Sequence, residues 1–178
     1  MKILPIVIIL LITKIGLACQ AQQIMKDSNP KVVNQKEVHK NGMVVRWHYQ
    51  GNRILIEMSA PTNGWVTVGF NDQDRIKGAY LLMGRVLNKQ AEVVEHYTIA
   101  PGNYHHIEAL GVKPAVQQVF SEQKDGKTTL KFSLPIEAAS KYQKSLKAGQ
   151  SYIMILAYSS DTDFQHHSRM RTSLKVTL

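Results

Sequence analysis

Short runs in which apolar and polar residues alternate limit the folds open to this chain more than any other feature. In Met43–Tyr49 the apolar side chains share one face of an extended strand, while Arg46 and His48 occupy the other. The alternation stops at residues 50–52, Gln-Gly-Asn, and resumes in Ile54–Met58. Two alternating runs joined by a short Gly/Asn turn are typical of a β-hairpin.

Further runs of the same kind follow at a regular spacing, with turn residues between them. Strands are predicted at Trp65–Phe70, Ala79–Leu87, Glu92–Ile99, Ala115–Lys124, Lys127–Leu134, Ser151–Tyr158 and Arg169–Leu178. The pair Asp125-Gly126 is a strong hairpin turn between two of these strands. About ten short strands separated by turns indicate an all-β fold, either an antiparallel sandwich or a barrel.

Two stretches depart from the strand pattern. Ala100–Pro114 is rich in Pro, Gly and His, so we expect it to be irregular. Pro135–Leu146 is predicted to form one short helix, because proline is favoured near a helix start and Gly149 is suited to closing the helix. The rest of the domain is predicted to be β-structure.

Size and charge set the broad class of protein. The chain has 178 residues, 44% of them hydrophobic and 20% charged, which is typical of one globular domain and not of a disordered chain. The formal net charge is +9, but the basic residues are scattered along the chain. No nucleic-acid-binding motif accompanies this charge, so a solvated basic surface and no nucleic acid partner are predicted.

The N-terminal segment has the order of a secretory signal. Lys2 precedes the apolar run Ile3–Ile12, and small residues follow at Ala18–Ala21. The apolar run is shorter than the roughly 20 residues that a membrane-spanning helix needs. We therefore expect a signal peptide at residues 1–21, a tether at 22–31 and one domain at 32–178 of a secreted or periplasmic protein.

The single cysteine leaves two processing routes open. Cleavage after Ala21, the favoured route, gives a mature domain without cysteine, in which disulfides, thiolate metal sites and a cysteine nucleophile are excluded. Alternatively, Cys19 in the segment GLAC is the acylated residue of a lipoprotein. By either route the folded domain depends on its core for stability.

The sequence lacks the motifs of catalysis by the polypeptide itself. It contains no G-x-S-x-G, H-E-x-x-H, G-x-G-x-x-G or Walker loop. Asp161 and Asp163 are the one persuasive carboxylate pair, and aspartates at such positions usually make turn hydrogen bonds. We therefore predict that the protein is not an enzyme.

An adjacent histidine pair, His166-His167, lies with Arg169 and Arg171 at the entrance of the last predicted strand. If the alternation extends back through the pair, the two rings point to opposite faces, which argues against a shared zinc ion. A haem needs only one or two axial ligands, typically His and Met, and an apolar slot between the sheets. Five methionines are available, each of which can also serve core packing: Met43, Met58, Met83, Met154 and Met170.

Four segments resemble the DOMON domain in the same order and spacing. They are GWVTVGFN (Gly64–Asn71), GAYLLMGRV (Gly78–Val86), TTLKFSLPI (Thr128–Ile136) and YIMILAYSS followed by HHSRMR. The resemblance covers the chain from about Val32 to Leu178. It implies an immunoglobulin-like antiparallel β-sandwich that binds haem b or a sugar in a pocket at one end. Relatives in this family include the cytochrome domain of cellobiose dehydrogenase and extracellular parts of some cytochrome b561 proteins.

The resemblance also implies which residues hold the haem. The family's haem-ligating histidine, which is followed by an arginine, is matched best by His167 with Arg171, and His166 is the neighbouring alternative. Arg169 would lie beside them, and arginines near a haem pair with its propionates. Trp65 and Tyr158 complete the predicted pocket: both come from segments that carry the resemblance.

The second haem ligand is the point where the chain departs from the family. Where the family places its methionine ligand, this chain has Ile76. Met83 is close by in sequence, and His105 or His106 could approach from the stretch predicted to be irregular. Each of these three is a candidate for the second ligand.

The expected function is binding of haem b for electron transfer or redox sensing, with a membrane protein as redox partner. The alternative is a non-haem module that binds a carbohydrate or small metabolite, with Trp65, Tyr80 and Tyr158 as stacking surfaces. A scaffold or adhesion domain with a merely polar pocket is the third hypothesis.

Overall fold

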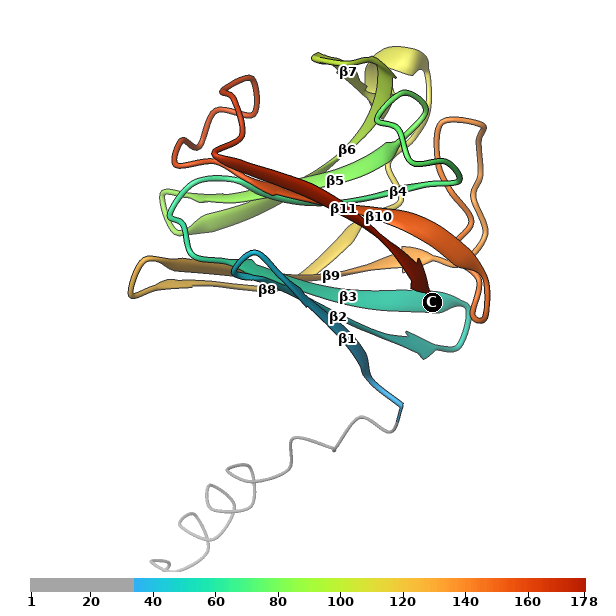
Figure 1. Cartoon of the computed structure of the whole chain (residues 1–178), viewed down its shortest axis with the longest axis horizontal. Coiled ribbons are helices and arrows are strands. Elements are labelled where there is room, and N and C mark those ends of the chain that lie inside the picture. The colour runs from blue at the N-terminus through green and yellow to red at the C-terminus, as the bar shows by residue number, and fades with distance from the viewer. Residues whose placement is uncertain (1–33) are drawn as a thin grey trace, which may run out of the picture. The chain divides into compact units, whose positions relative to one another are not determined.

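The computed structural model describes residues 34–178, which form two antiparallel sheets (Figure 1). Sheet A has the strand order β1-β2-β3-β9-β8, and sheet B has the order β11-β10-β4-β5-β6-β7. The strands of sheet A are β1 Lys36–Lys40, β2 Met43–Gln50, β3 Arg53–Ala60, β8 Gln117–Lys124 and β9 Lys127–Pro135. Those of sheet B are β4 Val66–Asn71, β5 Tyr80–Leu87, β6 Gln90–Ala100, β7 Asn103–His106, β10 Ser151–Tyr158 and β11 Met170–Thr177. One 3-10 turn, η1 (Ile107–Leu110), follows β7.

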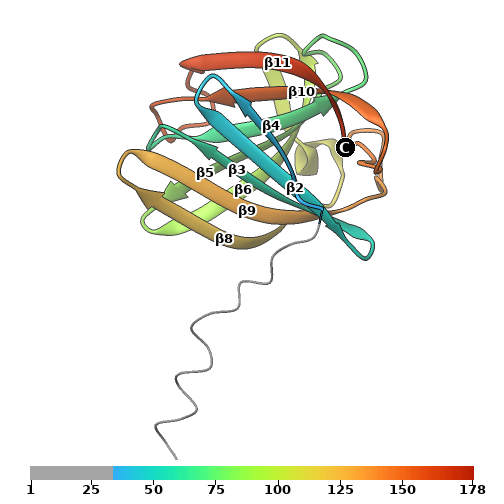
Figure 2. The same cartoon turned by 60° about the horizontal axis from the view of Figure 1, so that its bottom comes forward.

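The predicted fold class, an all-β antiparallel sandwich, is confirmed. Figure 2 brings sheet A forward, with β8 at one edge of it. The hairpin predicted at Asp125-Gly126 joins β8 to β9, and these two residues have φ values of 52° and 73°. Positive φ at both central residues is what a tight type I′ hairpin turn requires, and Asp-Gly is among its preferred pairs.

The inner faces of the two sheets form the main core. Ile54, Ile56 and Met58 of β3 are buried, and Glu57 between them faces outward because side chains along a strand alternate. They belong to the same cluster as Leu82 of β5 on the opposite sheet. Burial of apolar surface stabilises the fold by about 25 cal/mol per Å².

The helix predicted at Pro135–Leu146 is wrong, because this stretch forms turns and bends. Serine side chains take up its backbone N–H groups: Ala138 N donates to Ser145 Oγ at 3.0 Å, and Tyr142 N donates to Ser140 Oγ at 3.2 Å. Such local bonds between side chain and backbone compete with the helical pattern.

The stretch Ala100–Pro114, predicted to be irregular, is partly regular. It contains β7, which pairs with β6 across a register shift, and the turn η1. Gly111 ends η1 with a φ of 76°, a left-handed conformation that favours glycine. Three of the four β7 residues are exposed, so this strand carries little alternation of apolar and polar residues that the sequence could reveal.

Sheet B is apolar on its outer face as well as its inner face. Every residue of β4 is buried, as are the first five of β5. A second apolar cluster therefore forms outside the sandwich, around Trp65, Met83 and Phe164. Residues 159–169, which link β10 to β11 and are called the histidine loop below, contribute Phe164 to this cluster. This outer cluster is where the candidate site lies.

The predicted signal peptide (residues 1–21), the tether (22–31) and Cys19 lie outside the described residues. In residues 34–178, no helix has both the length and the apolar character that crossing a membrane requires.

Candidate ligand-binding site

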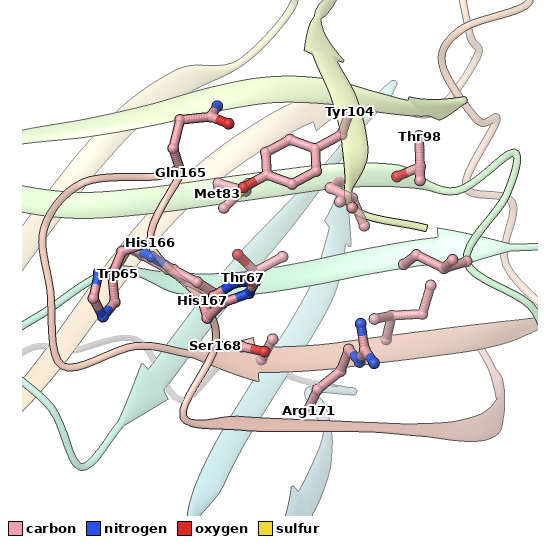
Figure 3. Close-up of a pocket in the computed structure, with 15 residues that line it drawn as sticks. Trp65, Thr67, Met83, Thr98, Tyr104, Gln165, His166, His167, Ser168 and Arg171 are labelled. Atoms are coloured by element: carbon pink, nitrogen blue, oxygen red, sulfur yellow. The ribbon is translucent and has the colours of Figure 1, made fainter. Parts of the chain in front are cut away.

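A pocket of about 150 Å³ lies on the outer face of sheet B (Figure 3). The prediction of an apolar slot between the two sheets is wrong. Side chains such as Phe70 and Phe132, which are at most 1% exposed, fill the space between the sheets. The lining comes instead from strands of sheet B, the loops beside them and the histidine loop.

The apolar floor of the pocket follows from the register of sheet B. Thr67 of β4 lies opposite Met83 of β5, and Gly69 lies opposite both Leu81 of β5 and Ile155 of β10. A Cβ at Gly69 would collide with the side chain of Leu81. Because glycine stands here, the two apolar side chains can close over β4 and form a continuous wall.

Three buried polar atoms in the lining have no hydrogen-bond partner in residues 34–178: Trp65 Nε1, Thr67 Oγ1 and Thr98 Oγ1. These residues are at most 4% exposed. Leaving a buried polar group unpaired costs about 1–3 kcal/mol, and native structures pair most such groups. The three atoms therefore mark the pocket as a place where a ligand or an ordered water supplies the missing partners.

The histidine loop is joined to the start of β4 through its backbone. Ser159 N donates to Trp65 O at 3.0 Å, and Trp65 N donates to Asp161 O at 2.9 Å. Gly64 is needed beside this junction, because a Cβ there would collide with the loop backbone between Ser159 and Asp161. The loop therefore begins in a fixed position against the pocket.

Two aspartates shape the middle of the histidine loop. Asp161 Oδ1 accepts a hydrogen bond from Asp163 N at 2.8 Å, and Asp163 Oδ1 accepts one from Gln165 N at 3.0 Å. These bonds confirm the predicted turn role of the two carboxylates. Ser159 Oγ then donates to His167 O at 3.0 Å, which fixes the backbone of the histidine pair.

His166 and His167 both line the pocket, and both side chains are exposed at its rim. The prediction that their rings point to opposite faces is wrong, because β11 begins only at Met170 and the pair belongs to the loop. His166 Nδ1 lies 3.8 Å from Asp161 Oδ2, so the two form an ion pair when the imidazole is protonated.

The other predicted site residues divide between the two faces of sheet B. Trp65, Met83 and Arg171 line the pocket. In Figure 3, Arg171 lies in the lower part of the view and Met83 in the upper part. Tyr158 packs against the inner core, because its neighbour Ala157 faces the pocket and side chains alternate. Arg169 is exposed and lies outside the lining.

Two aromatic residues proposed as stacking surfaces are therefore unavailable to the pocket. Tyr80 is 2% exposed in the inner core, and Tyr158 packs against the same core. Of the three predicted stacking residues, Trp65 alone lines the pocket. Ile76, which stands where the family resemblance places a methionine, also lines it, whereas His105 and His106 do not.

Sequence reasoning missed His96, which lies fully buried beneath the histidine loop. Its ring centroid lies 4.3 Å from that of His106, 5.5 Å from that of Tyr104 and 5.8 Å from that of Phe164. Burial, with the nearby His106, lowers the pKa of His96 to about 4. The signal available in the sequence is the position of His96 between Val94 and Thr98 on one strand face.

In residues 34–178, no three side chains of His, Cys, Asp or Glu converge on a point that could hold a metal ion. His167, Met83 and Arg171 bring an imidazole, a thioether and a guanidinium to a pocket with an apolar floor.

The sequence matches the family model of the DOMON domain over residues 39–159, which is more than half of the chain. The chain belongs to the DOMON family. The match ends at Ser159, so the histidine pair lies beyond the matched residues.

Solved structures with a similar fold include two fungal cytochrome domains. The cytochrome b domain of pyranose dehydrogenase from Coprinopsis cinerea matches with a TM-score of 0.62 and 8% sequence identity, covering 79% of this chain and 80% of that one. The cytochrome domain of Myriococcum thermophilum cellobiose dehydrogenase matches with a TM-score of 0.59 and 9% identity, covering 81% of each chain.

Proposed function

We propose that this DOMON domain binds haem b on the outer face of sheet B and serves electron transfer or redox sensing. The observation that carries the proposal is that His167, Met83 and Arg171 line one pocket with an apolar floor. Imidazole and thioether groups are axial haem ligands, and a guanidinium pairs with a propionate. The similar fold of the two fungal cytochrome domains supports the same ligand.

The size of the site supports a ligand that extends past the pocket. Small-molecule sites usually have volumes of about 300–1,000 Å³, and the pocket alone holds about 150 Å³. A second cavity of about 410 Å³, called the side hollow below, shares Ile76, Ile155 and Arg171 with the pocket. A flat molecule as large as haem would occupy both.

When bound, haem supplies a one-electron redox couple. The imidazole of His167, or of His166, would hold the iron from the rim, and the thioether of Met83 would be the second protein ligand. The backbone bonds of the histidine loop keep the imidazole in place before the ligand arrives. Leu81 and Ile155 would exclude water from the buried side of the ligand.

The direct test is the absorption spectrum of the protein expressed with a haem supply. We expect a Soret band that His167→Ala or His166→Ala weakens or shifts. His39→Ala is the control, because His39 lies on β1 with a side chain 60% exposed. The haem proposal is contradicted if the protein shows no Soret band after incubation with hemin and removal of the unbound hemin.

A second candidate ligand is a carbohydrate or small metabolite, favoured by the three unpaired polar atoms of Trp65, Thr67 and Thr98. Hydroxyl groups of such a ligand would satisfy them, with the indole ring available for stacking. In that case a colourless protein should gain thermal stability with sugars and not with hemin. Thr67→Val and Thr98→Val should each remove this gain in thermal stability. If the natural chain responds to no ligand at all, the hypothesis of a scaffold or adhesion domain is favoured.

The proposal includes export of the protein and a redox partner in a membrane. The intact mass of the protein made in its own cell type distinguishes cleavage after Ala21 from acylation of Cys19. Cleavage after Ala21 gives a chain that begins at Gln22, whereas a lipoprotein carries acyl groups on Cys19. A mass that includes Met1 and the following residues contradicts export through this signal.

A further inference from the structure

Two arginines, Arg75 and Arg171, line the side hollow together with one acid, Asp74. Arg75 comes from the loop between β4 and β5, and Arg171 comes from β11. Neither guanidinium forms an ion pair with an acid in residues 34–178. Like charges beside one cavity repel each other, so an anion between them lowers the energy.

Of the other four arginines in residues 34–178, two pair with acids, whereas Arg53 and Arg169 do not. Arg46 pairs with Glu57 at 2.8 Å, and Arg85 pairs with Glu92 at 2.8 Å. Arg169 is also exposed and unpaired within residues 34–178, but it lies outside the lining of both cavities. It therefore serves as a matched control for the two arginines of the side hollow.

The backbone that carries Arg75 is fixed beside β11. Asn71, which is 4% exposed, donates through Nδ2 to Arg75 O at 2.6 Å and to Lys77 O at 3.0 Å. Ser173 Oγ of β11 donates to Asp74 Oδ1 at 2.9 Å, which ties the loop to the strand of Arg171. Both arginines therefore start from anchored positions.

We infer that the side hollow is an anion subsite, in which Arg75 and Arg171 hold a carboxylate or phosphate of the ligand whose apolar part occupies the pocket. Guanidinium groups bind both anions through two parallel hydrogen bonds. The side hollow and the pocket share three lining residues, so one molecule can reach both. The inference deepens the proposed function and rests on it for the apolar part of the ligand. For haem the anion would be a propionate.

Asp74 adds one negative charge to the lining of the side hollow. Its carboxylate lines the same cavity and opposes an anion, so the lining carries two positive charges against one negative charge. Replacing Asp74 with asparagine keeps the bond from Ser173 and removes the repulsion. Asp74→Asn should therefore change anion affinity in the direction opposite to the arginine variants.

The test compares protoporphyrin IX with its dimethyl ester, both free of iron, by quenching of tryptophan fluorescence. We expect the natural chain to prefer the free acid at low salt. Arg75→Gln and Arg171→Gln should each weaken binding of the free acid by about three- to tenfold more than they weaken binding of the ester. Asp74→Asn should strengthen binding of the free acid, and 0.5 M salt, roughly, should shrink all these differences.

Arg169→Gln should leave both affinities unchanged. Equal losses for acid and ester in the Arg75 and Arg171 variants, or an equal loss in Arg169→Gln, would overturn the anion subsite. Because iron is absent from both probes, the result does not depend on which residue ligates a haem.

A second arm separates failure of this inference from failure of the haem proposal. If neither porphyrin binds, inorganic pyrophosphate is added and the melting temperature is measured. A rise in the natural chain that disappears in the Arg75→Gln/Arg171→Gln double variant supports a subsite for free anions and removes the haem proposal alone. Without any rise, the anion subsite is overturned as well.

Discussion

The guanidinium of Arg85 lies over the ring of Phe164, with its central carbon 4.3 Å from the ring centroid. The same guanidinium donates from Nη1 to Thr162 O at 2.8 Å. Phe164 O in turn accepts a hydrogen bond from the Tyr104 hydroxyl. A residue of β5 and a residue of β7 therefore clamp the histidine loop against the outer face of sheet B.

Removing the Phe164 ring should loosen this loop more than the rest of the domain. Phe164 is 5% exposed, and deletion of a buried phenylalanine ring costs about 3–5 kcal/mol. In Phe164→Ala we expect faster hydrogen exchange in residues 159–169 and weaker ligand binding, with protection of β2 and β3 retained in the remaining folded protein. Phe120→Ala is the control, because Phe120 is 44% exposed and should cost less than about 1 kcal/mol. Uniform loss of protection over all strands would contradict a local clamp.

His96 should make the domain less stable in acid. Burial, with the nearby His106, lowers the pKa of His96 from 6.5 to about 4. As the pH falls below about 6.5, the unfolded chain takes up a proton that the folded chain binds only near pH 4, so stability decreases across this window. The loss contributed by His96 reaches about 3 kcal/mol at the acid end, since one pKa unit corresponds to 1.36 kcal/mol.

The measurement is urea unfolding between pH 7 and pH 4. His96→Phe keeps an aromatic ring against Phe164 and should flatten the dependence of unfolding free energy on pH. An NMR titration of the natural chain gives an independent check, because the His96 ring should stay neutral until the pH approaches 4. Protonation near its ordinary pKa would contradict the prediction.

Glu95 is a buried carboxylate that holds together three parts of the domain. Its Oε2 accepts from the Tyr80 hydroxyl at 2.6 Å and from Gln143 Nε2 at 2.9 Å, and its Oε1 accepts from Val116 N at 2.7 Å. Glu95→Ala would leave these donors unpaired, and each unpaired buried group costs about 1–3 kcal/mol. We expect a loss of several kcal/mol by thermal unfolding. Glu92→Ala, at a position with a side chain 46% exposed, should cost less than about 1 kcal/mol. Similar losses at the two positions would refute the role given to Glu95.

Ile76→Met should change the haem spectrum of the Met83→Leu variant if haem occupies the site. Ile76 lines both cavities and stands where the family resemblance places a methionine ligand. Because Met83 is the proposed second ligand, Met83→Leu should shift the ferric spectrum away from a low-spin, six-coordinate form, and adding Ile76→Met to that variant should restore it. The change in packing at residue 76 should cost less than about 1.5 kcal/mol. Met83→Leu is the complementary variant, because it removes the thioether already present. Unchanged spectra in both variants would show that neither position faces the iron.

Local patterns were enough to predict most of the fold. Alternation located the strands, and Asp125-Gly126 identified a hairpin, because both signals depend only on neighbouring residues. The same rules failed at Pro135–Leu146, where serine side chains take the backbone N–H groups that a helix would use. They also failed at the histidine pair, since a loop does not keep the alternation of the strand that follows it.

The sequence by itself determined the all-β fold class and the residue types of the site, a histidine pair with nearby arginine and methionine. Tertiary structure alone decided that the pocket lies outside the sandwich, that Tyr158 faces away from it and that Arg75 joins Arg171. The physical reason is that alternation encodes the direction of a side chain relative to its own strand. Which face becomes a pocket depends on contacts between loops far apart in the chain, such as that of Arg85 with Phe164.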